Sequence, residues 1–148
     1  MTVNFAHCFF EQSGVFRDEF KKLGIPANDY DLCDQFGETD WRGDLFAQIE
    51  LSYSGKRSII DRIKPDDLII AFFPCTYFCG HNEMFFCGTN YNYRKFTKAT
   101  VLDKIIERAQ LRHEYYITLL KFCRVVEDRN LRAVIENPYN AHHYWRFN

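Results

Sequence analysis

The thiol of Cys75 and the carboxyl of Glu136 are the side chains in this sequence best placed for chemistry on a bound ring. Cys75 follows a continuous apolar run that ends in Pro74. Glu136 follows a short β-type run and precedes Asn137. A cysteine acts as a nucleophile when its surroundings stabilise the thiolate, and a partly desolvated carboxyl is a natural proton donor. A nucleophile and an acid at neighbouring strand ends form a specific pair, whereas an arbitrary cysteine is more often a buried structural residue.

Two further β-type runs end in polar residues. The first ends in the sequence Phe-Glu-Gln-Ser-Gly over residues 10–14, and the second ends near Asp31. In an open parallel sheet, ligands bind beyond the carboxyl ends of the strands, near the point where the strand order reverses. The Asp31 carboxylate is therefore a candidate acceptor for ribose hydroxyls, and an acid that merely forms a turn is an equally good interpretation. The single glycine of residues 10–14 is a weaker signal than a full GxGxxG motif.

A zinc site is a less favoured use of the cysteines. Its candidate ligands are Cys75, Cys79, His81 and Cys87. Their C-x3-C-x-H-x5-C spacing matches no compact zinc motif, so the thiols are interpreted without a metal. His142 and His143 are expected to be surface residues.

Charge is unevenly distributed along the chain. Residues 27–50 carry a local net charge of −6, and residues 90–112 carry +4 from six basic and two acidic side chains. Aromatic residues are interleaved with these basic side chains. This composition suits a nucleic acid, whose phosphates would contact the basic side chains and whose nucleobases would stack on the rings. DNA is therefore a possible partner of residues 91–112. The alternative is a solvated helix face with local ion pairs, such as Lys104 with Glu107.

Alternating strands and helices must position these residues. The expected strands are 3–10, 28–33, 68–73 and 133–135. Helical spacing follows Phe16 and Leu45, and a long amphipathic helix is predicted from about residue 100 to 128. This alternation predicts an α/β fold with a mostly parallel sheet and right-handed crossovers. Residues 75–97 form a long loop, which we interpret as a candidate functional loop.

Composition favours one intracellular domain. The chain has 148 residues, of which 47% are hydrophobic and 26% charged, so a single domain over 1–148 is expected. No apolar run approaches the ~20 residues of a membrane helix, and no basic segment followed by an apolar stretch opens the chain. We therefore expect a cytoplasmic location, no membrane, and six reduced cysteines.

The order of these motifs resembles that of the DNA cytosine-5 methyltransferases. The matching motifs, in chain order, are Phe10…Ser13-Gly14…Phe16, Asp31, Gly43-Asp44-Leu45, Asp67…Phe73-Pro74-Cys75-Thr76-Tyr77-Phe78, a long helix, and Val134-Ile135-Glu136-Asn137-Pro138. The match covers most of the chain. It implies the three-layer Rossmann-like fold of class I methyltransferases, and S-adenosylmethionine as the cofactor.

The resemblance also implies a role for each residue. Cys75 would attack C6 of a flipped cytosine, and Glu136 would engage ring N3. Cofactor contacts would fall on Phe10, Ser13, Gly14, Asp31, Asp44 and Pro74. The residues of the first loop, Phe10, Ser13 and Gly14, would hold the methionine part of the cofactor. Asp31 would bind its ribose and Asp44 its adenine.

The chain also departs from the family pattern. Glu11 and Gln12 stand where the family has glycines, and the chain ends at Asn148 without the target-recognition domain, so we expect a fold truncated at its C-terminal side. These differences favour a second hypothesis, a catalytically inactive module that binds a nucleotide or a protein. A third hypothesis interprets residues 137–139, Asn-Pro-Tyr, as a degenerate form of the motif that methylates amino groups. An exposed sheet edge predicts pairing with a second copy or a partner protein.

Overall fold

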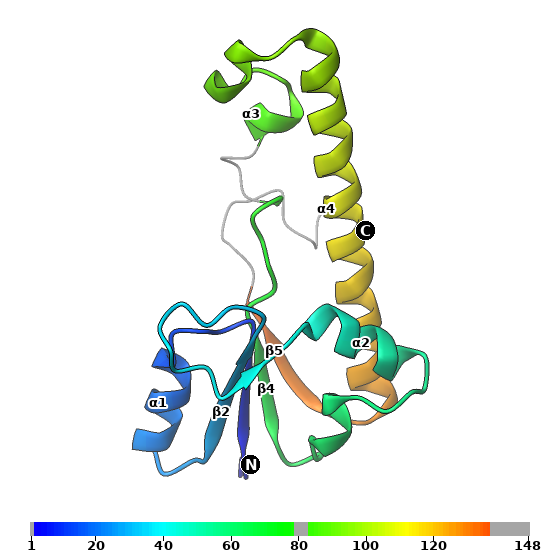
Figure 1. Cartoon of the computed structure of the whole chain (residues 1–148). Helices are drawn as coiled ribbons and strands as arrows, with labels where there is room; N and C mark the ends of the chain where they lie inside the picture. Colours follow the sequence, from blue (N-terminus) through cyan, green and yellow to red (C-terminus); the bar gives the residue numbers. More distant parts are fainter. Residues whose placement is uncertain (1, 79–82, 137–148) are drawn as a thin grey trace. The chain divides into compact units, whose positions relative to one another are not determined.

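Five short parallel strands form the centre of the fold in the computed structural model, which describes residues 2–78 and 83–136 (Figure 1). The strands are β1 (Ala6–Phe9), β2 (Ala27–Asp31), β3 (Trp41–Arg42), β4 (Leu68–Ala71) and β5 (Arg132–Ile135). They pair in the order β3-β2-β1-β4-β5, and every pair is parallel. The predicted parallel sheet is therefore confirmed.

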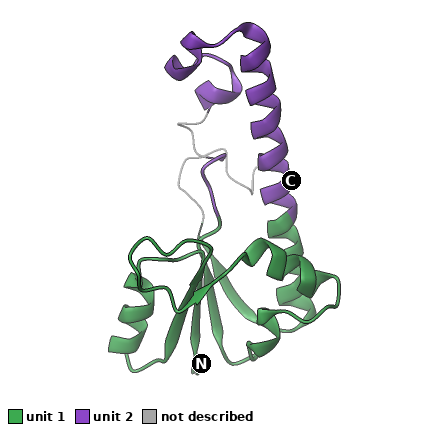
Figure 2. Ribbon diagram, viewed as in Figure 1, with its two compact units in different colours: residues 1–73, 118–136 green, residues 74–117, 137–148 purple. Residues whose placement is uncertain are grey.

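The helices fall into two compact units (Figure 2). The α-helices are α1 (Val15–Lys22), α2 (Leu45–Tyr53), α3 (Glu83–Phe86) and α4 (Lys98–Asp128), and two 3-10 helices are η1 (Ile59–Arg62) and η3 (Tyr91–Lys95). Among the described residues, the first unit comprises 2–73 and 118–136, and the second comprises 74–78 and 83–117. The sheet, α1 and α2 belong to the first unit. The second unit contains α3, η3 and most of α4.

Aromatic side chains fill one face of the sheet. Phe9 of β1 lies opposite Tyr30 of β2 in register, and their ring centres are 5.2 Å apart. Phe122 of α4 lies 6.1 Å from the Phe9 ring and 5.4 Å from that of Phe73. All four side chains are buried. The end of α4 is thereby fixed to this face, since burial of such rings is the main favourable term in folding.

Helix α1 covers the other face, and its contacts there are partly polar. Arg17 of α1 is buried beside Asp29 of β2, and the Phe16 ring lies 4.5 Å from that of Phe72. Figure 1 shows α1 on one side of the sheet and α2 with the end of α4 on the other. This α/β arrangement is consistent with a Rossmann-like fold.

Strands β1, β2 and β4 are shorter than predicted, whereas β5 and α4 begin slightly earlier than expected. The second strand ends at Asp31 rather than residue 33, because the Asp31 carboxylate accepts a hydrogen bond from the Cys33 amide (2.7 Å) and starts a turn. Three elements were not predicted as such, namely the two-residue β3, the four-residue α3 and η3. No helix in the described ranges combines the length and apolarity that a membrane span requires.

Candidate cofactor and catalytic site

The order of the strands defines where a ligand site is expected. β1 and β4 lie side by side at the centre of the sheet, with β2 and β3 beyond β1 and β5 beyond β4. After β1 the chain adds β2 and β3 on one side of this pair, and after β4 it adds β5 on the other side, so the strand order reverses between β1 and β4. A crevice beyond the carboxyl ends of such a strand pair is where open α/β sheets bind ligands. Residues 10–14 follow β1 at this point.

Phe10 begins this segment in a strained backbone conformation. Its φ is +59°, in the left-handed region that bulky residues rarely adopt. The Phe10 amide donates a hydrogen bond to the Tyr30 carbonyl (2.8 Å), and the Phe10 ring lies 4.6 Å from Phe73 and 5.7 Å from Phe46. The turn is therefore held by both the sheet and the aromatic cluster. Strained residues of this kind are concentrated at functional sites.

Glu11 is a buried carboxylate with one unsatisfied oxygen. Its Oε1 accepts hydrogen bonds from the Ser13 amide (2.8 Å) and from the Ser13 hydroxyl. Its Oε2 is buried and has no hydrogen-bond partner among the described residues, although Glu11 is only 7% exposed. Burial of a carboxylate without full pairing is costly, so this oxygen is a candidate acceptor for a ligand. The sequence had identified Glu11 only as a replacement for glycine.

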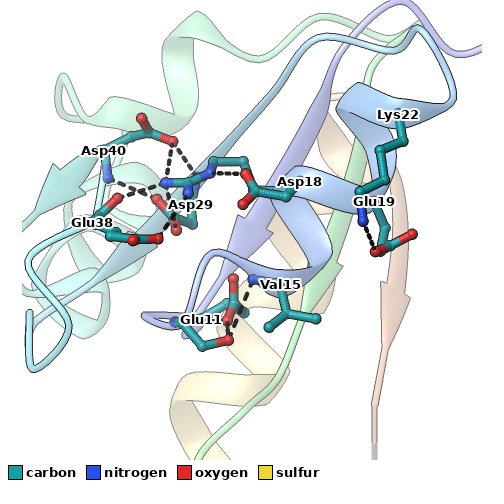
Figure 3. A network of polar contacts seen from close by, with 10 residues as sticks. Glu11, Val15, Asp18, Glu19, Lys22, Asp29, Glu38 and Asp40 are labelled. Atoms are coloured by element: carbon teal, nitrogen blue, oxygen red, sulfur yellow. Dashed lines mark hydrogen bonds and ion pairs between the residues drawn. The ribbon is translucent and has the colours of Figure 1, made fainter.

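Carboxylates outnumber cations next to this turn (Figure 3). The buried guanidinium of Arg17 forms ion pairs with Asp18 (2.8 Å), Asp29 (3.3 Å), Glu38 (3.4 Å) and Asp40 (3.5 Å). The hydrogen bond with Asp18, together with the nearby acids, raises the pKa of Arg17. Burial raises the pKa of Asp29. One guanidinium does not neutralise four carboxylates, so the local charge is negative.

The same network fixes the segment between β2 and β3 beside the first turn. Asp29 and Asp40 exchange hydrogen bonds, each carboxylate accepting the amide of the other residue (2.7 and 3.1 Å). Gly14, with φ +71°, lies against the Arg17 guanidinium, and a Cβ at this position would clash with it. A larger residue at position 14 would therefore be strained by the positive φ and would also displace the Arg17 guanidinium.

Asp31 and Asp44 lie in local structures that occupy one oxygen of each. Asp31 Oδ1 bonds the Cys33 amide, which confirms the turn interpretation, while its role as a ribose ligand stays a prediction. Asp44 Oδ1 accepts the amides of Phe46 and Ala47 and caps α2. This cap orients α2 without showing any contact to adenine.

Cys75 and Glu136 belong to different units. Cys75 is a half-buried residue of the second unit, and its carbonyl accepts the Phe78 amide (2.8 Å) in a turn that follows Pro74. Glu136 of the first unit is exposed, so the expectation of a partly desolvated carboxyl is wrong for this structure; its amide donates to the Ala71 carbonyl of β4 (2.9 Å). Each residue follows the carboxyl end of its strand as predicted. Their pairing stays a prediction.

The other thiols differ in accessibility. Cys8 is fully buried, and burial raises its pKa to about 12, so it cannot supply a thiolate. Cys33 and Cys87 are exposed. Cys79 and His81 of the zinc hypothesis lie outside the described residues, as do His142, His143 and the Asn-Pro-Tyr segment. Residues 2–78 and 83–136 contain no group of three or more side chains suited to a metal ion.

The comparisons with known proteins identify no relative. The chain matches no protein-family model, no curated protein and no solved structure. The function must therefore be argued from the chain's own residues.

Proposed function

We propose that this chain is an S-adenosylmethionine-dependent protein of the DNA cytosine-5 methyltransferase type. One observation carries the proposal. The strand order reverses between β1 and β4, and the residues that resemble the family motifs follow the carboxyl ends of the strands around this point. They are residues 10–14 after β1, Asp31 at the end of β2, Pro74-Cys75 after β4 and Glu136 after β5.

The charges beside β1 favour a cationic cofactor. Glu11 already accepts the Ser13 amide at the start of α1, where a phosphate would otherwise bind. A dinucleotide would bring its pyrophosphate against this buried carboxylate, whereas S-adenosylmethionine brings a sulfonium and an ammonium group. The unpaired Oε2 of Glu11 is a suitable acceptor for that ammonium group.

The cofactor part of the proposal is distributed over four segments. Phe10, Ser13 and Gly14 would hold the methionine part, Asp31 the ribose and Asp44 the adenine. Asp31 Oδ2 has no partner among the described residues, so a second acceptor remains for a hydroxyl. Pro74 is the remaining cofactor contact that the resemblance implies.

Cys75 and Glu136 would supply the chemistry on the cytosine ring. C5 of cytosine is too weak a nucleophile to take a methyl group directly. A Cys75 thiolate that adds to C6 makes C5 nucleophilic, and hydrogen bonding from Glu136 to N3 stabilises the charge that develops on the ring. Bound S-adenosylmethionine would supply the electrophilic methyl group. The transfer would leave S-adenosylhomocysteine. A water molecule would then take the C5 proton while the C6–S bond breaks, which would release the Cys75 thiolate and re-form the C5–C6 double bond.

The substrate would be DNA, and its target base must leave the helix stack to reach such a site. The lysine and arginine side chains of residues 91–112 are the proposed contacts to the DNA phosphates.

Covalent trapping tests the proposal. Fluorine at C5 cannot leave as a proton does, so a 5-fluorocytosine ring that has been attacked and methylated stays bonded to the enzyme. The chain is incubated with S-adenosylmethionine and DNA of mixed sequence that carries 5-fluorocytosine. We expect mass spectrometry to find the adduct on Cys75, with loss in Cys75→Ser and retention in the matched Cys87→Ser. Cofactor binding without any adduct would instead support the inactive-module hypothesis.

A further inference from the structure

Four cations of the second unit lie beside aromatic rings or at the start of α4, without a paired acid among the described residues. Arg94 lies 4.6 Å from the Tyr91 ring centre, and Lys104 lies 5.0 Å from that of Phe96. Lys95 lies 5.4 Å from the same Phe96 ring. In the described part of the chain, none of Arg94, Lys95, Lys98 and Lys104 forms an ion pair with an acid. The Lys104–Glu107 pair considered as an alternative is therefore absent.

Two hollows in this unit share the same aromatic lining. Tyr93 and Phe96 line both of them. The smaller, about 250 Å³, also includes the Tyr77 ring. The larger, about 470 Å³, extends along the start of α4. Tyr93 is only 6% exposed, and its hydroxyl has no hydrogen-bond partner among the described residues. A buried, unsatisfied hydroxyl thus lies on a residue that lines both hollows.

Each hollow has its own cations. Lys95 and Lys104 line the smaller hollow together with Arg108, against the one acid Glu107. Arg94 and Lys98 line the larger one, whose lining contains no acid. A ligand that fits must therefore offer flat rings with hydrogen-bonding groups and at least two anionic groups in succession. Consecutive nucleotides have this chemistry.

The exposure of the rings distinguishes single strands from duplexes. Tyr91 is 72% exposed and Phe96 is 37% exposed. A ring face can stack on a base only when that base is free of its neighbours, so a duplex would use the cations alone. The smaller hollow is also below the roughly 300 Å³ at which sites for drug-sized ligands begin, which suits a single base.

We propose that the second unit binds single-stranded DNA, with neighbouring nucleotides seated in the two hollows that share Tyr93 and Phe96. The choice of DNA over RNA rests on the proposed function, whereas single-strand binding needs neither cofactor nor methyl transfer. Bases stack on the rings, the Tyr93 hydroxyl bonds a base edge, and the lysine and arginine side chains contact phosphates.

Fluorescence anisotropy without cofactor tests this inference on the full chain. A labelled thymidine oligomer, the same strand in a duplex, and its RNA counterpart are compared at equal salt. We expect the single DNA strand to bind about tenfold more tightly than the duplex, as stacking of one or two bases allows. A plot of the logarithm of the binding constant against the logarithm of the salt concentration should have a slope of about −2.8, from roughly 0.7 for each of four contacted phosphates.

Charge-matched variants locate the site. Lys95→Gln/Lys98→Gln should weaken binding and reduce the slope by about 1.4, for two lost phosphate contacts. Lys21→Gln/Lys22→Gln on α1 removes the same charge and should leave the affinity and slope unchanged. Phe96→Ala removes the exposed ring that lines both hollows and should weaken single-strand binding about tenfold.

Three results would overturn the inference. They are a duplex bound as tightly as the single strand, equal effects of the two lysine pairs, and an RNA strand bound more tightly than DNA. Because no cofactor is present, such a failure is distinct from a failure of S-adenosylmethionine to bind the first unit.

Discussion

Replacing Arg17 by methionine should strongly destabilise the first unit. The change removes the only cation near Asp29 that forms an ion pair with it in the described structure, at 3.3 Å. The side chain of Arg17 is 9% exposed and that of Asp29 is 0% exposed, so Asp29 would be left as a buried, unpaired charge. The segment that holds Glu38 and Asp40 would also lose its contacts with Arg17, while keeping the hydrogen bonds between Asp29 and Asp40.

The expected magnitude follows from this burial. Breaking a buried ion pair by removing one partner costs about 3–5 kcal/mol of unfolding free energy. For a chain of this size that corresponds to roughly 6–20 °C in Tm. Lys22→Met on the same helix is the matched control, because the Lys22–Glu19 pair is at the surface and is screened by solvent. Asp29→Asn in the Arg17→Met background removes the buried charge and should recover part of the loss.

Urea denaturation followed by circular dichroism measures these differences, and pH gives a second check. Burial raises the pKa of Asp29 in the folded state, so ionised Asp29 opposes folding above that pKa, and the penalty disappears as the carboxyl is protonated. The Arg17→Met defect should therefore shrink as the pH falls from neutral toward about 4. A loss of unfolding free energy at neutral pH no larger than that of Lys22→Met would refute the reasoning.

Three other predictions concern single buried groups. Glu11→Gln should weaken S-adenosylmethionine binding by roughly 10- to 100-fold in calorimetry, as expected for one charged hydrogen bond, whereas the exposed Glu19→Gln should not. Cys8, whose pKa burial raises to about 12, should resist iodoacetamide near pH 8 in the native protein while Cys33 is alkylated, as peptide mass mapping would show. Burial lowers the pKa of His7, so the unfolded chain takes up its proton first and stability should fall as the pH drops below about 6.5. His7→Gln should flatten that fall in denaturation curves, and an unchanged pH dependence would contradict this assignment.

The sequence predicted the sheet because its signals are local. The apolar run from Leu68 and the turn residues around Gly14 and Gly24 mark strand and helix boundaries without knowledge of the rest of the chain. Gly24 indeed adopts φ +78° just beyond α1. The two-residue β3 has no such signal, since two residues cannot show a period.

The polar network could not be predicted in this way. Seven acids lie between residues 27 and 50, and nothing local indicates that Asp29 is buried while Asp31 is half-exposed. Both residues lie on the same face of β2, but Asp29 packs against Arg17 of α1, whereas Asp31 ends the strand and starts a turn. Glu11 follows a left-handed turn at Phe10. Phenylalanine rarely adopts this backbone conformation, so the residue type gives no hint of the turn.

The most direct test of the central claim is calorimetric titration of the unmodified chain with S-adenosylmethionine. The proposed site predicts saturable binding of one cofactor per chain, and no competition by a dinucleotide whose pyrophosphate would meet Glu11. The absence of any saturable heat at millimolar S-adenosylmethionine would contradict the cofactor site, and with it the proposed methyl transfer.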